Sequence, residues 1–316
     1  MIRFVCRALA VTTAAAALLA GSFAIPAEAA AGSEPVSVSS PLRIMPLGDS
    51  ITYGVGTPAH DSYRSELQRR LAAAGVDADF VGSQRSGTGP DRDNEGHPGW
   101  TIAQLAEHID EWLADYEPDV ILLHIGTNDM FGGTPGASAQ LGALLDRIHQ
   151  DRPDAQVFVA KLIGLGITQR TGGQMVRTAA FNDAVGRLVA RRGEQFHLVD
   201  QSDIRGIDMH DRLHPNAYGY ATMAWKWYRA LEPVLNDSGT PWPADDNPLT
   251  ADVSVRCLGG TVTLPAYAKG CRRWYHRRPP GAVTYRVWQL PVRRQVTYRS
   301  GTGIKTRPVR TWFTAP

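Results

Sequence analysis

Short apolar runs alternate along most of the chain with longer amphipathic stretches. The apolar runs predict five buried strands, which lie at residues 42–47, 78–82, 120–125, 156–162 and 196–199. A hydrophobic spacing of three to four residues predicts the helices, at residues 63–74, 102–116, 140–149, 175–192 and 217–235. Strands joined by helices of this length run parallel, and the helices cover both faces of the sheet. The pattern therefore predicts an α/β fold, a three-layer α/β/α sandwich with a five-stranded parallel sheet in the flavodoxin-like arrangement.

Three segments depart from this alternation. Residues 83–100 are polar and predict a long loop, of the kind that is usually functional or disordered. Residues 236–250 are rich in Pro and Asp, which is typical of a linker. Residues 251–316 carry short Val, Thr, Tyr and Trp runs without a helical period, so we expect a small, β-rich C-terminal region.

Charge divides the chain near the same place. From Val253 to the end there are 13 Lys and Arg residues and no Asp or Glu, which leaves 20 basic and 31 acidic side chains in residues 1–252. A domain boundary is the simplest explanation of such a change. We therefore expect one large domain at residues 41–235, the linker at 236–250 and a basic region at 251–316.

The arginine-rich part of the basic region has three possible interpretations. Its ten arginines from Arg272 to Arg310 could form a patch for an acidic polymer or an anionic surface, and its tryptophans could bind sugars. A β module without a ligand is the plainer interpretation. The third is a shifted reading frame from about Gly270, since a shifted GC-rich frame tends to enrich Arg and Pro and to lose acidic residues.

The first 30 residues have the features of a secretory signal peptide. Arg3 and Arg7 precede an apolar run at residues 8–20, and Ala27-Glu28-Ala29 has the small-x-small form of a cleavage site. A membrane anchor is the alternative, but the run is short and no stop-transfer pattern follows it. We therefore expect residues 1–30 to be a signal peptide, and the mature protein to be secreted and without a membrane segment.

Export also affects the interpretation of the cysteines. Cys6 leaves with the signal peptide, so the mature chain keeps Cys257 and Cys271. Two cysteines in an exported chain suggest one disulfide, which would stabilise the fold by about 3 kcal/mol. Two free thiols are the alternative.

Candidate catalytic side chains follow three of the predicted strands. Ser50 comes after the first strand and Asn128 after the third. Asp211 and His214 follow the fifth. The carboxyl ends of parallel strands meet at one edge of the sheet, where functional crevices lie. There, Ser50 can act as nucleophile, His214 as its base, and Asp211 can bind the other imidazole nitrogen.

An acyl transfer of this kind also needs donors for an oxyanion. The side-chain amide of Asn128 is one candidate, and the backbone N–H groups of Ser50 and Gly99 are the others. Each feature alone is weak, because a Ser after a strand is usually a turn or cap residue and a lone His is more often structural. Their occurrence together at three strand ends favours catalysis.

Two other patterns suggest a cofactor or a metal. Gly54-x-Gly56-x-x-Ala59 formally matches a dinucleotide fingerprint, but Pro58 and His60 stand where a helix should begin. Alternating acids at Asp91, Asp93 and Glu95 could hold calcium, although a solvated acidic loop is the plainer interpretation. We therefore expect no cofactor and no metal.

Four blocks resemble those of the GDSL, or SGNH, hydrolase superfamily. They are GDSIT with Ser50, GHPGWT with Gly99, GTND with Asn128, and DRLHP with Asp211 and His214. The resemblance covers residues 42–235. Within it, four segments are similar to those of carbohydrate esterase family 3, the acetyl xylan esterases: DFVGSQ, EGHPGWTI, VILLHIGTNDM and LHPNAYGYATMAWKWY.

This resemblance implies a serine esterase that removes O-acetyl groups from plant polysaccharide. It implies Ser50 as nucleophile, His214 as base and Asp211 as the residue that orients it. The implied oxyanion hole consists of the Ser50 N–H, the Gly99 N–H and Asn128, with Gly96 of the same block as the alternative to Gly99.

We therefore expect residues 41–235 to be the catalytic domain of a secreted esterase that acts on acetylated polysaccharide such as xylan through an acyl-enzyme. We expect a monomer with no nucleic-acid partner. One alternative is an esterase or lipase for small acyl or lipid esters, and another is an inactive carbohydrate-binding protein. Tyr53, Trp100 and Phe131 flank the site, where they could stack on sugars or pack in the core.

Overall fold

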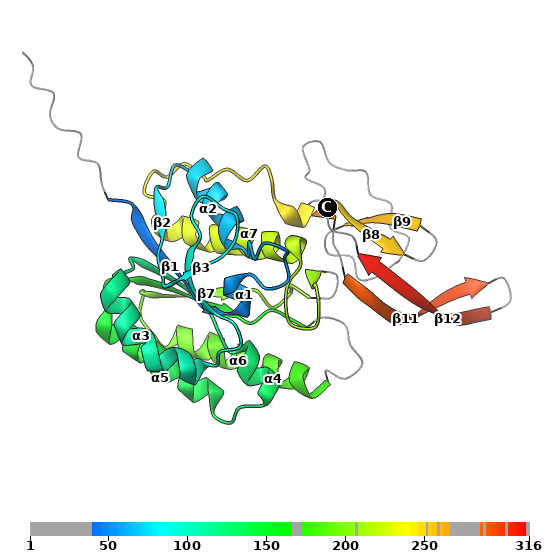
Figure 1. Ribbon diagram of the computed structural model, residues 1–316, viewed down its shortest axis with the longest axis horizontal. Helices are drawn as coiled ribbons and strands as arrows, with labels where there is room; N and C mark the ends of the chain where they lie inside the picture. The colour runs from blue at the N-terminus through cyan, green and yellow to red at the C-terminus, as the bar shows by residue number, and fades with distance from the viewer. Residues whose placement is uncertain are drawn as a thin grey trace, which may run out of the picture. The chain divides into compact units, whose positions relative to one another are not determined.

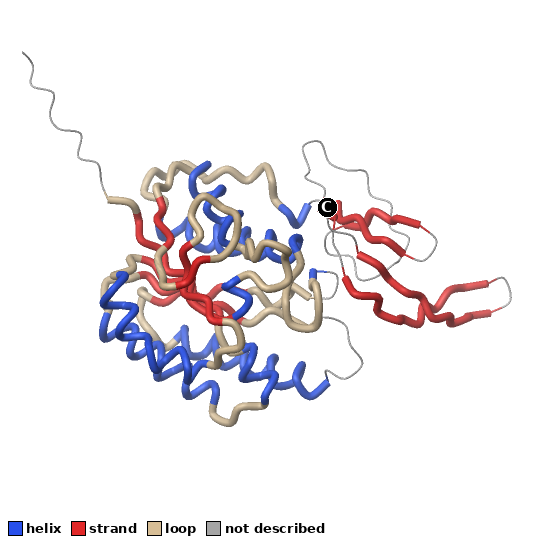
Figure 2. The backbone as a smooth tube through the Cα atoms, viewed as in Figure 1, coloured by secondary structure: helices blue, strands red, loops and turns tan. Residues whose placement is uncertain are grey.

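The computed structural model describes residues 40–165, 172–205 and 208–250, and the backbone of five strands between residues 252 and 313 (Figures 1 and 2). The predicted signal peptide at residues 1–30 lies outside the described residues, and so does Cys271. Secretion and the disulfide between Cys257 and Cys271 therefore stay predictions.

A mostly parallel sheet forms the centre of the large domain (Figure 1). Five of its strands lie side by side in the order β2 (Ala78–Phe80), β1 (Leu42–Asp49), β5 (Val120–His124), β6 (Gln156–Lys161) and β7 (Phe196–Asp200). All four pairings between them are parallel. Numbered along the chain these strands stand in the order 2-1-3-4-5, which is the flavodoxin-like arrangement. The predicted fold class is confirmed.

The polar segment that we expected to be a loop adds two strands to this sheet. β3 (Gln84–Arg85) pairs antiparallel with β4 (Asp93–His97), and β4 pairs in parallel with the end of β1. The sheet therefore has seven strands rather than five. Periodicity could not reveal β4, because the side chains it buries most completely, Asn94 and Glu95, are polar.

Helices cover both faces of the sheet (Figure 2). α3 (Ile102–Tyr116), α5 (Ala137–Asp151) and α6 (Gly172–Ala190) pack on one face. α2 (Arg64–Ala73) and α7 (Ala217–Leu235) pack on the other. Alternate strand residues supply the two cores, since successive side chains of a strand point to opposite faces.

β5 is an example of this alternation. Val120 and Leu122 belong to the core under α2 and α7, whereas Ile121 and Leu123 belong to the core under α3, α5 and α6. All five residues of the strand are buried, as is usual for a central strand of a parallel sheet. Among the described residues, no helix has both the length and the apolar character that crossing a bilayer requires.

The segment that we expected to be a linker packs on α7 and α2. Trp242 is 5% exposed, its ring centroid lies 5.0 Å from that of Tyr228, and its backbone N–H donates to Glu232 Oε1 at 2.8 Å. Arg70 donates to both the carboxylate and the carbonyl of Asp246. Residues 236–250 are thus part of the surface layer of the large domain. The division into domains stays a prediction.

The basic C-terminal region contains a second sheet, and its described parts are strands, in keeping with its composition. The strands are β8 (Asp252–Cys257), β9 (Gly260–Pro265), β10 (Tyr285–Arg286), β11 (Gln289–Ser300) and β12 (Gly303–Phe313). They pair in the order β10-β8-β12-β11, with β9 on β8. The three interpretations of this region stay open.

The burial of Trp242 predicts that the segment at 236–250 contributes to stability. We expect Trp242→Ala to lower the free energy of unfolding by about 3–5 kcal/mol, because it leaves a large cavity against α7. Urea denaturation measures this change. Asp245→Ala, an exposed position of the same segment, is the control. A loss below about 1 kcal/mol for Trp242→Ala would show that the segment is only a connection.

Candidate active site

Ser50 lies at the sharp transition from β1 to the short helix α1 (Ser50–Tyr53). Asp49 caps this helix, because its Oδ1 accepts a hydrogen bond from the Ile51 N–H at 2.9 Å. Gly48 permits the transition: a Cβ there would lie 2.3 Å from the carbonyl oxygen of His124. The turn therefore holds Ser50, which is 8% exposed, at the carboxyl end of β1.

Ser50, His214 and Asp211 form one chain of hydrogen bonds. Ser50 Oγ lies 3.0 Å from His214 Nε2, and His214 Nδ1 lies 2.8 Å from Asp211 Oδ2. The other carboxylate oxygen of Asp211 accepts the backbone N–H groups of Leu213 at 2.7 Å and His214 at 2.8 Å. The structure thus brings together the three residues that the sequence singles out, in the geometry of a nucleophile, a base and an orienting acid.

Hydrogen bonding keeps Asp211 ionised. Partial burial raises the pKa of Asp211, but the hydrogen bonds from the His214 ring and from the backbone N–H groups of His214 and Leu213 outweigh it and bring the pKa to about 2. An ionised carboxylate only accepts hydrogen bonds, so the proton of a neutral His214 must be on Nδ1. Nε2 is then free to accept the proton of Ser50.

The loop that carries His214 is fixed at both ends. The His210 N–H donates to the His214 carbonyl at 2.8 Å, and Met209 pairs with Pro215 in an isolated bridge. Asn216 then caps α7 through the Gly219 N–H at 3.0 Å. The His214 loop is therefore anchored to the first turn of the buried helix α7, and this anchoring positions the imidazole.

Gly54 and Gly56 have a structural role in the same region. Both have a φ of 111°, and a Cβ on Gly56 would lie 2.2 Å from the Pro215 carbonyl oxygen and 3.1 Å from His214 Cβ. Glycine at 56 therefore lets the segment after α1 approach the His214 loop. The dinucleotide fingerprint fails here, because the described chain starts no helix at these glycines and the next one, α2, begins only at Arg64.

Asn128 lies in α4 (Thr127–Gly132), which follows β5. Its Nδ2 donates to the carbonyl oxygen of Trp100 at 2.7 Å. This bond uses one of the two amide hydrogens and fixes the plane of the amide. Within the described residues the other amide hydrogen has no acceptor, so it can bind a ligand at the strand ends.

The two candidate glycines of the GHPGW segment differ in their hydrogen bonding. The Gly96 N–H donates to Asn94 Oδ1 at 3.0 Å, so this donor is occupied. Gly99 has a φ of 87°, and its N–H finds no acceptor among the described residues. The structure therefore favours Gly99 over Gly96 as a donor to a ligand.

A stack of aromatic rings supports this segment. The centroid of the His97 ring lies 4.1 Å from that of Trp100 and 4.8 Å from that of Trp112, and the two tryptophan centroids are 6.0 Å apart, so the three rings form a cluster. His97 Nε2 lies 2.5 Å from Glu95 Oε1, and the fully buried Glu95 also accepts from the N–H and the hydroxyl of Ser83, each at 2.7 Å. The carbonyl that orients Asn128 therefore belongs to a residue held by a buried network, and Trp100 packs within the protein.

Sequence reasoning missed the roles of Glu95 and His97. It placed Glu95 with Asp91 and Asp93 in a calcium site or a solvated loop, but Glu95 is buried and the three carboxylates bind different groups. Asp91 accepts the Phe80 N–H at 2.6 Å, and Asp93 pairs with Arg85 at 2.7 Å. In the described part of the chain no three His, Cys, Asp or Glu side chains are placed to hold a metal. Because Asp93–His97 contains only polar residues and glycine, its periodicity gives no signal of a buried strand.

Phe131 and Tyr53 differ in their surroundings. Phe131 follows Asn128 on α4 and is 48% exposed, with the Arg212 guanidinium 4.4 Å above its ring. Tyr53 contacts the His60 ring at 5.3 Å between centroids. Phe131 therefore offers an apolar surface beside the loop of His214.

The model of the GDSL-like lipase/acylhydrolase family matches residues 47–222, which include every residue of the site. The chain belongs to this family. The family resemblance expected from the four blocks is confirmed. Family 3 carbohydrate esterase from Clostridium thermocellum is 36% identical, with a TM-score of 0.55, over 61% of this chain and 96% of that chain.

Two further proteins resemble this chain over a similar share of its length. A family 3 carbohydrate esterase from Talaromyces cellulolyticus is 24% identical, with a TM-score of 0.53 over 63% of this chain and all of that chain, and supports the fold alone. A multidomain esterase of Ruminococcus flavefaciens is 29% identical in an alignment of 236 positions that covers 65% of this chain. The match spans only 30% of the length of that protein.

Asp49 makes the free energy of unfolding depend on pH. Complete burial raises its pKa to about 6, although the Ile51 N–H and the nearby His214 act to lower it. The folded protein therefore holds this proton more tightly than the unfolded chain does. The free energy of unfolding that this group contributes is present below pH 4 and is lost as the pH rises through about 6.

We therefore expect Asp49→Asn to change how stability depends on pH. The asparagine keeps an oxygen for the Ile51 N–H but never ionises. Between pH 4 and pH 7.5 the wild type should lose up to about 3 kcal/mol relative to the variant. Urea denaturation at the two pH values measures this, with Asp237→Asn as the matched control for one exposed carboxylate. Parallel stability curves for wild type and Asp49→Asn would contradict the argument.

Proposed function

We propose that this chain is a secreted serine esterase that hydrolyses O-acetyl esters of polysaccharide such as xylan. One observation carries the chemistry: the hydrogen-bond chain from Ser50 through His214 to Asp211 lies at the same sheet edge as the donors of Asn128 and Gly99. Secretion rests on the signal-peptide pattern of residues 1–30, and we propose a monomer.

Acylation begins with Ser50. His214 Nε2 takes the hydroxyl proton as Ser50 Oγ attacks the acetyl carbonyl carbon, and Asp211 stabilises the imidazolium that forms. The carbonyl oxygen becomes an oxyanion, which the N–H groups of Ser50 and Gly99 and the amide of Asn128 bind. The carbon–oxygen bond to the sugar then breaks, and His214 returns the proton to the departing sugar hydroxyl.

Deacylation repeats these steps with water. His214 takes a proton from a water molecule, which attacks the acetyl group on Ser50. The same donors bind the second oxyanion. Acetate leaves as Ser50 recovers its proton from His214, so one water is consumed for each ester cleaved. These steps need only groups that the chain supplies.

The substrate class rests on two lines of support. The Clostridium thermocellum carbohydrate esterase is 36% identical over nearly its whole length. The exposed Phe131, with Arg212 above it, gives the rim of the site a surface for a ligand larger than an acetyl group. An esterase for small acyl or lipid esters is the alternative, and an inactive carbohydrate-binding protein is disfavoured by the intact hydrogen-bond chain.

Acetate release from acetylated xylan by the mature protein tests the proposal. We expect Ser50→Ala to lower the rate by a factor of about 10³ or more without unfolding, because it removes the nucleophile. Ser40→Ala, an exposed serine outside the site, is the control. A short aryl acetate is assayed alongside.

The outcomes separate the alternatives. Hydrolysis of the aryl acetate alone would keep the mechanism and remove the polysaccharide assignment. A folded wild type that is inactive on both substrates would overturn the esterase proposal. Release of acetate that survives in Ser50→Ala would exclude Ser50 as the nucleophile.

The oxyanion role of Asn128 has its own test. We expect Asn128→Ala to lower kcat by about 10²- to 10³-fold with little change in KM, since this donor acts mainly on the charge that develops in the transition state. Asn128→Asp keeps the shape of the side chain and replaces the donor with a negative charge, so it should be at least as impaired. Kinetics on the aryl acetate measures both. A loss below tenfold in folded variants would remove Asn128 from the oxyanion hole.

A further inference from the structure

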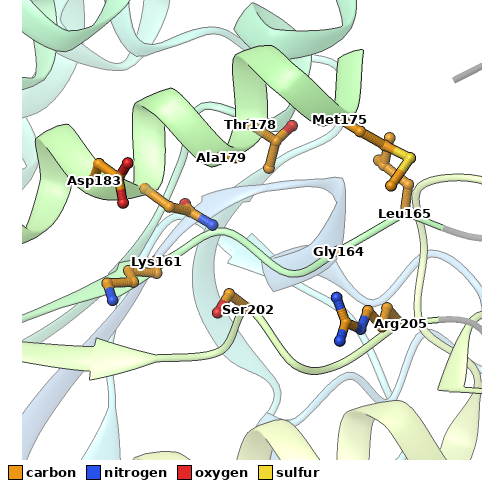
Figure 3. A pocket seen from close by; sticks show the side chains of 10 residues that line it. Lys161, Gly164, Leu165, Met175, Thr178, Ala179, Asp183, Ser202 and Arg205 are labelled. Atoms are coloured by element: carbon orange, nitrogen blue, oxygen red, sulfur yellow. The ribbon is translucent and has the colours of Figure 1, made fainter. Parts of the chain in front are cut away.

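A cavity of about 330 Å³ lies beside the ends of β6 and β7 (Figure 3). α6 forms one wall, with Thr178 and Asp183 among its lining residues. The segment after β7 forms the opposite wall and contributes Ser202 and Arg205. None of the residues proposed for ester hydrolysis lines it. Pockets of this size are at the lower end for small ligands, and they suit a single sugar residue.

Hydrogen bonds fix both walls of the cavity to the segment that follows β6. Asn182 of α6 accepts from the Leu162 N–H at 2.7 Å and donates to the Leu162 carbonyl at 2.9 Å. The Gly164 N–H donates to the Ile204 carbonyl at 2.9 Å. A Cβ on Gly164 would lie 2.7 Å from Arg205 Cβ, so the glycine leaves room for the arginine stem. The cavity is therefore formed before any ligand binds, which lowers the cost of binding.

The charges that line the cavity fall into paired and unpaired groups. Lys161 Nζ lies 2.8 Å from Asp200 Oδ2, and the Ser202 hydroxyl donates to Asp200 Oδ1. In the described part of the chain, the Arg205 guanidinium and the Asp183 carboxylate have neither a hydrogen bond nor an ion pair. Figure 3 shows them at different places around the cavity. Both side chains are exposed to solvent, so one accessible cation and one accessible acceptor are available to a ligand.

The position of the cavity relates it to the catalytic edge. β6 is the second strand from β1, and β7 is the third. Neighbouring strands are about 4.8 Å apart, so the ends of β6 and β7 lie about 10–15 Å along the sheet from the end of β1, where Ser50 lies. A group in the cavity and an acetyl group at Ser50 must therefore belong to different residues of one extended substrate.

We propose that this cavity binds a uronic acid residue of the acetylated polysaccharide, with Arg205 holding its carboxylate. This inference rests on the proposed function. A guanidinium binds a carboxylate through two parallel hydrogen bonds. The Asp183 carboxylate can accept hydrogen bonds from sugar hydroxyls. An acidic sugar uses both free groups, whereas a neutral sugar leaves Arg205 without a partner.

Binding to an inactive protein tests this directly. Calorimetry with Ser50→Ala compares two acetyl-free xylo-oligosaccharides of equal length, one of which carries a single glucuronic acid substituent. We expect the acidic ligand to bind about fivefold more tightly, as one solvent-accessible ion pair implies. Adding Arg205→Gln should reduce its affinity to that of the neutral ligand. Adding Arg187→Gln, which removes an exposed arginine of α6 outside the cavity, should preserve the preference.

A second measurement needs no variant of Arg205. The preference of Ser50→Ala for the acidic ligand should fall as NaCl is raised from 0.05 to about 1 M, because salt screens an accessible ion pair. Equal affinity for the two ligands, or a preference that survives Arg205→Gln, would overturn the proposal. Because the ligands carry no acetyl groups, failure of the esterase assay and failure of this binding test are distinguishable.

Discussion

The register of β1 against its two neighbours is the constraint on which the site depends. Gly48 of β1 pairs with Gly96 of β4 on one side and with His124 of β5 on the other. The three strands therefore end at the same level, and the residues that follow them meet. A side chain at Gly48 would collide with the His124 carbonyl, so close pairing at this point requires glycine. A slip of one residue in either pairing would separate Ser50 from the oxyanion donors.

Near Ser50, hydrogen bonding as well as burial determines which carboxyl group is ionised. Asp49 and Asp211 are carboxyl groups close to the same histidine, and their pKa values move in opposite directions. Asp49 is completely buried, and one backbone hydrogen bond does not offset its desolvation. Asp211 is partly exposed and accepts three hydrogen bonds from two residues, so its charge is stable at neutral pH. The acid that must stay ionised for catalysis is the one with the richer hydrogen bonding.

The sequence predicts features that depend on the spacing of apolar residues or on residues close together in the chain. Buried strands such as β5 and the amphipathic α7 follow from periodicity, and α7 has the predicted bounds of 217–235. Asp211 and His214 are three residues apart, so a tight turn is enough to join them. β4 escaped prediction because it buries polar side chains whose partners are distant in the chain. The sequence does not predict the contact of Trp242 with Tyr228 either, because nothing in a Pro- and Asp-rich segment indicates which helix the segment packs against.

The cavity beside β6 and β7 could not be predicted from the sequence either. It also shows that different residues of this fold can cleave the ester and select the substrate. That the Arg205 guanidinium forms no ion pair within the described residues can be learned only from the positions of Asp183, Asp200 and Asp208, the last of which accepts the Arg205 backbone N–H. Ester cleavage uses groups that follow β1, β4 and β5 together with Asp211 and His214 from the segment after β7, whereas Arg205 lies beside the ends of β6 and β7. An ester of one small acid spans only the first of these places. A polymer laid along the sheet edge spans both, so changes at Arg205 can alter which chains are held without moving Ser50.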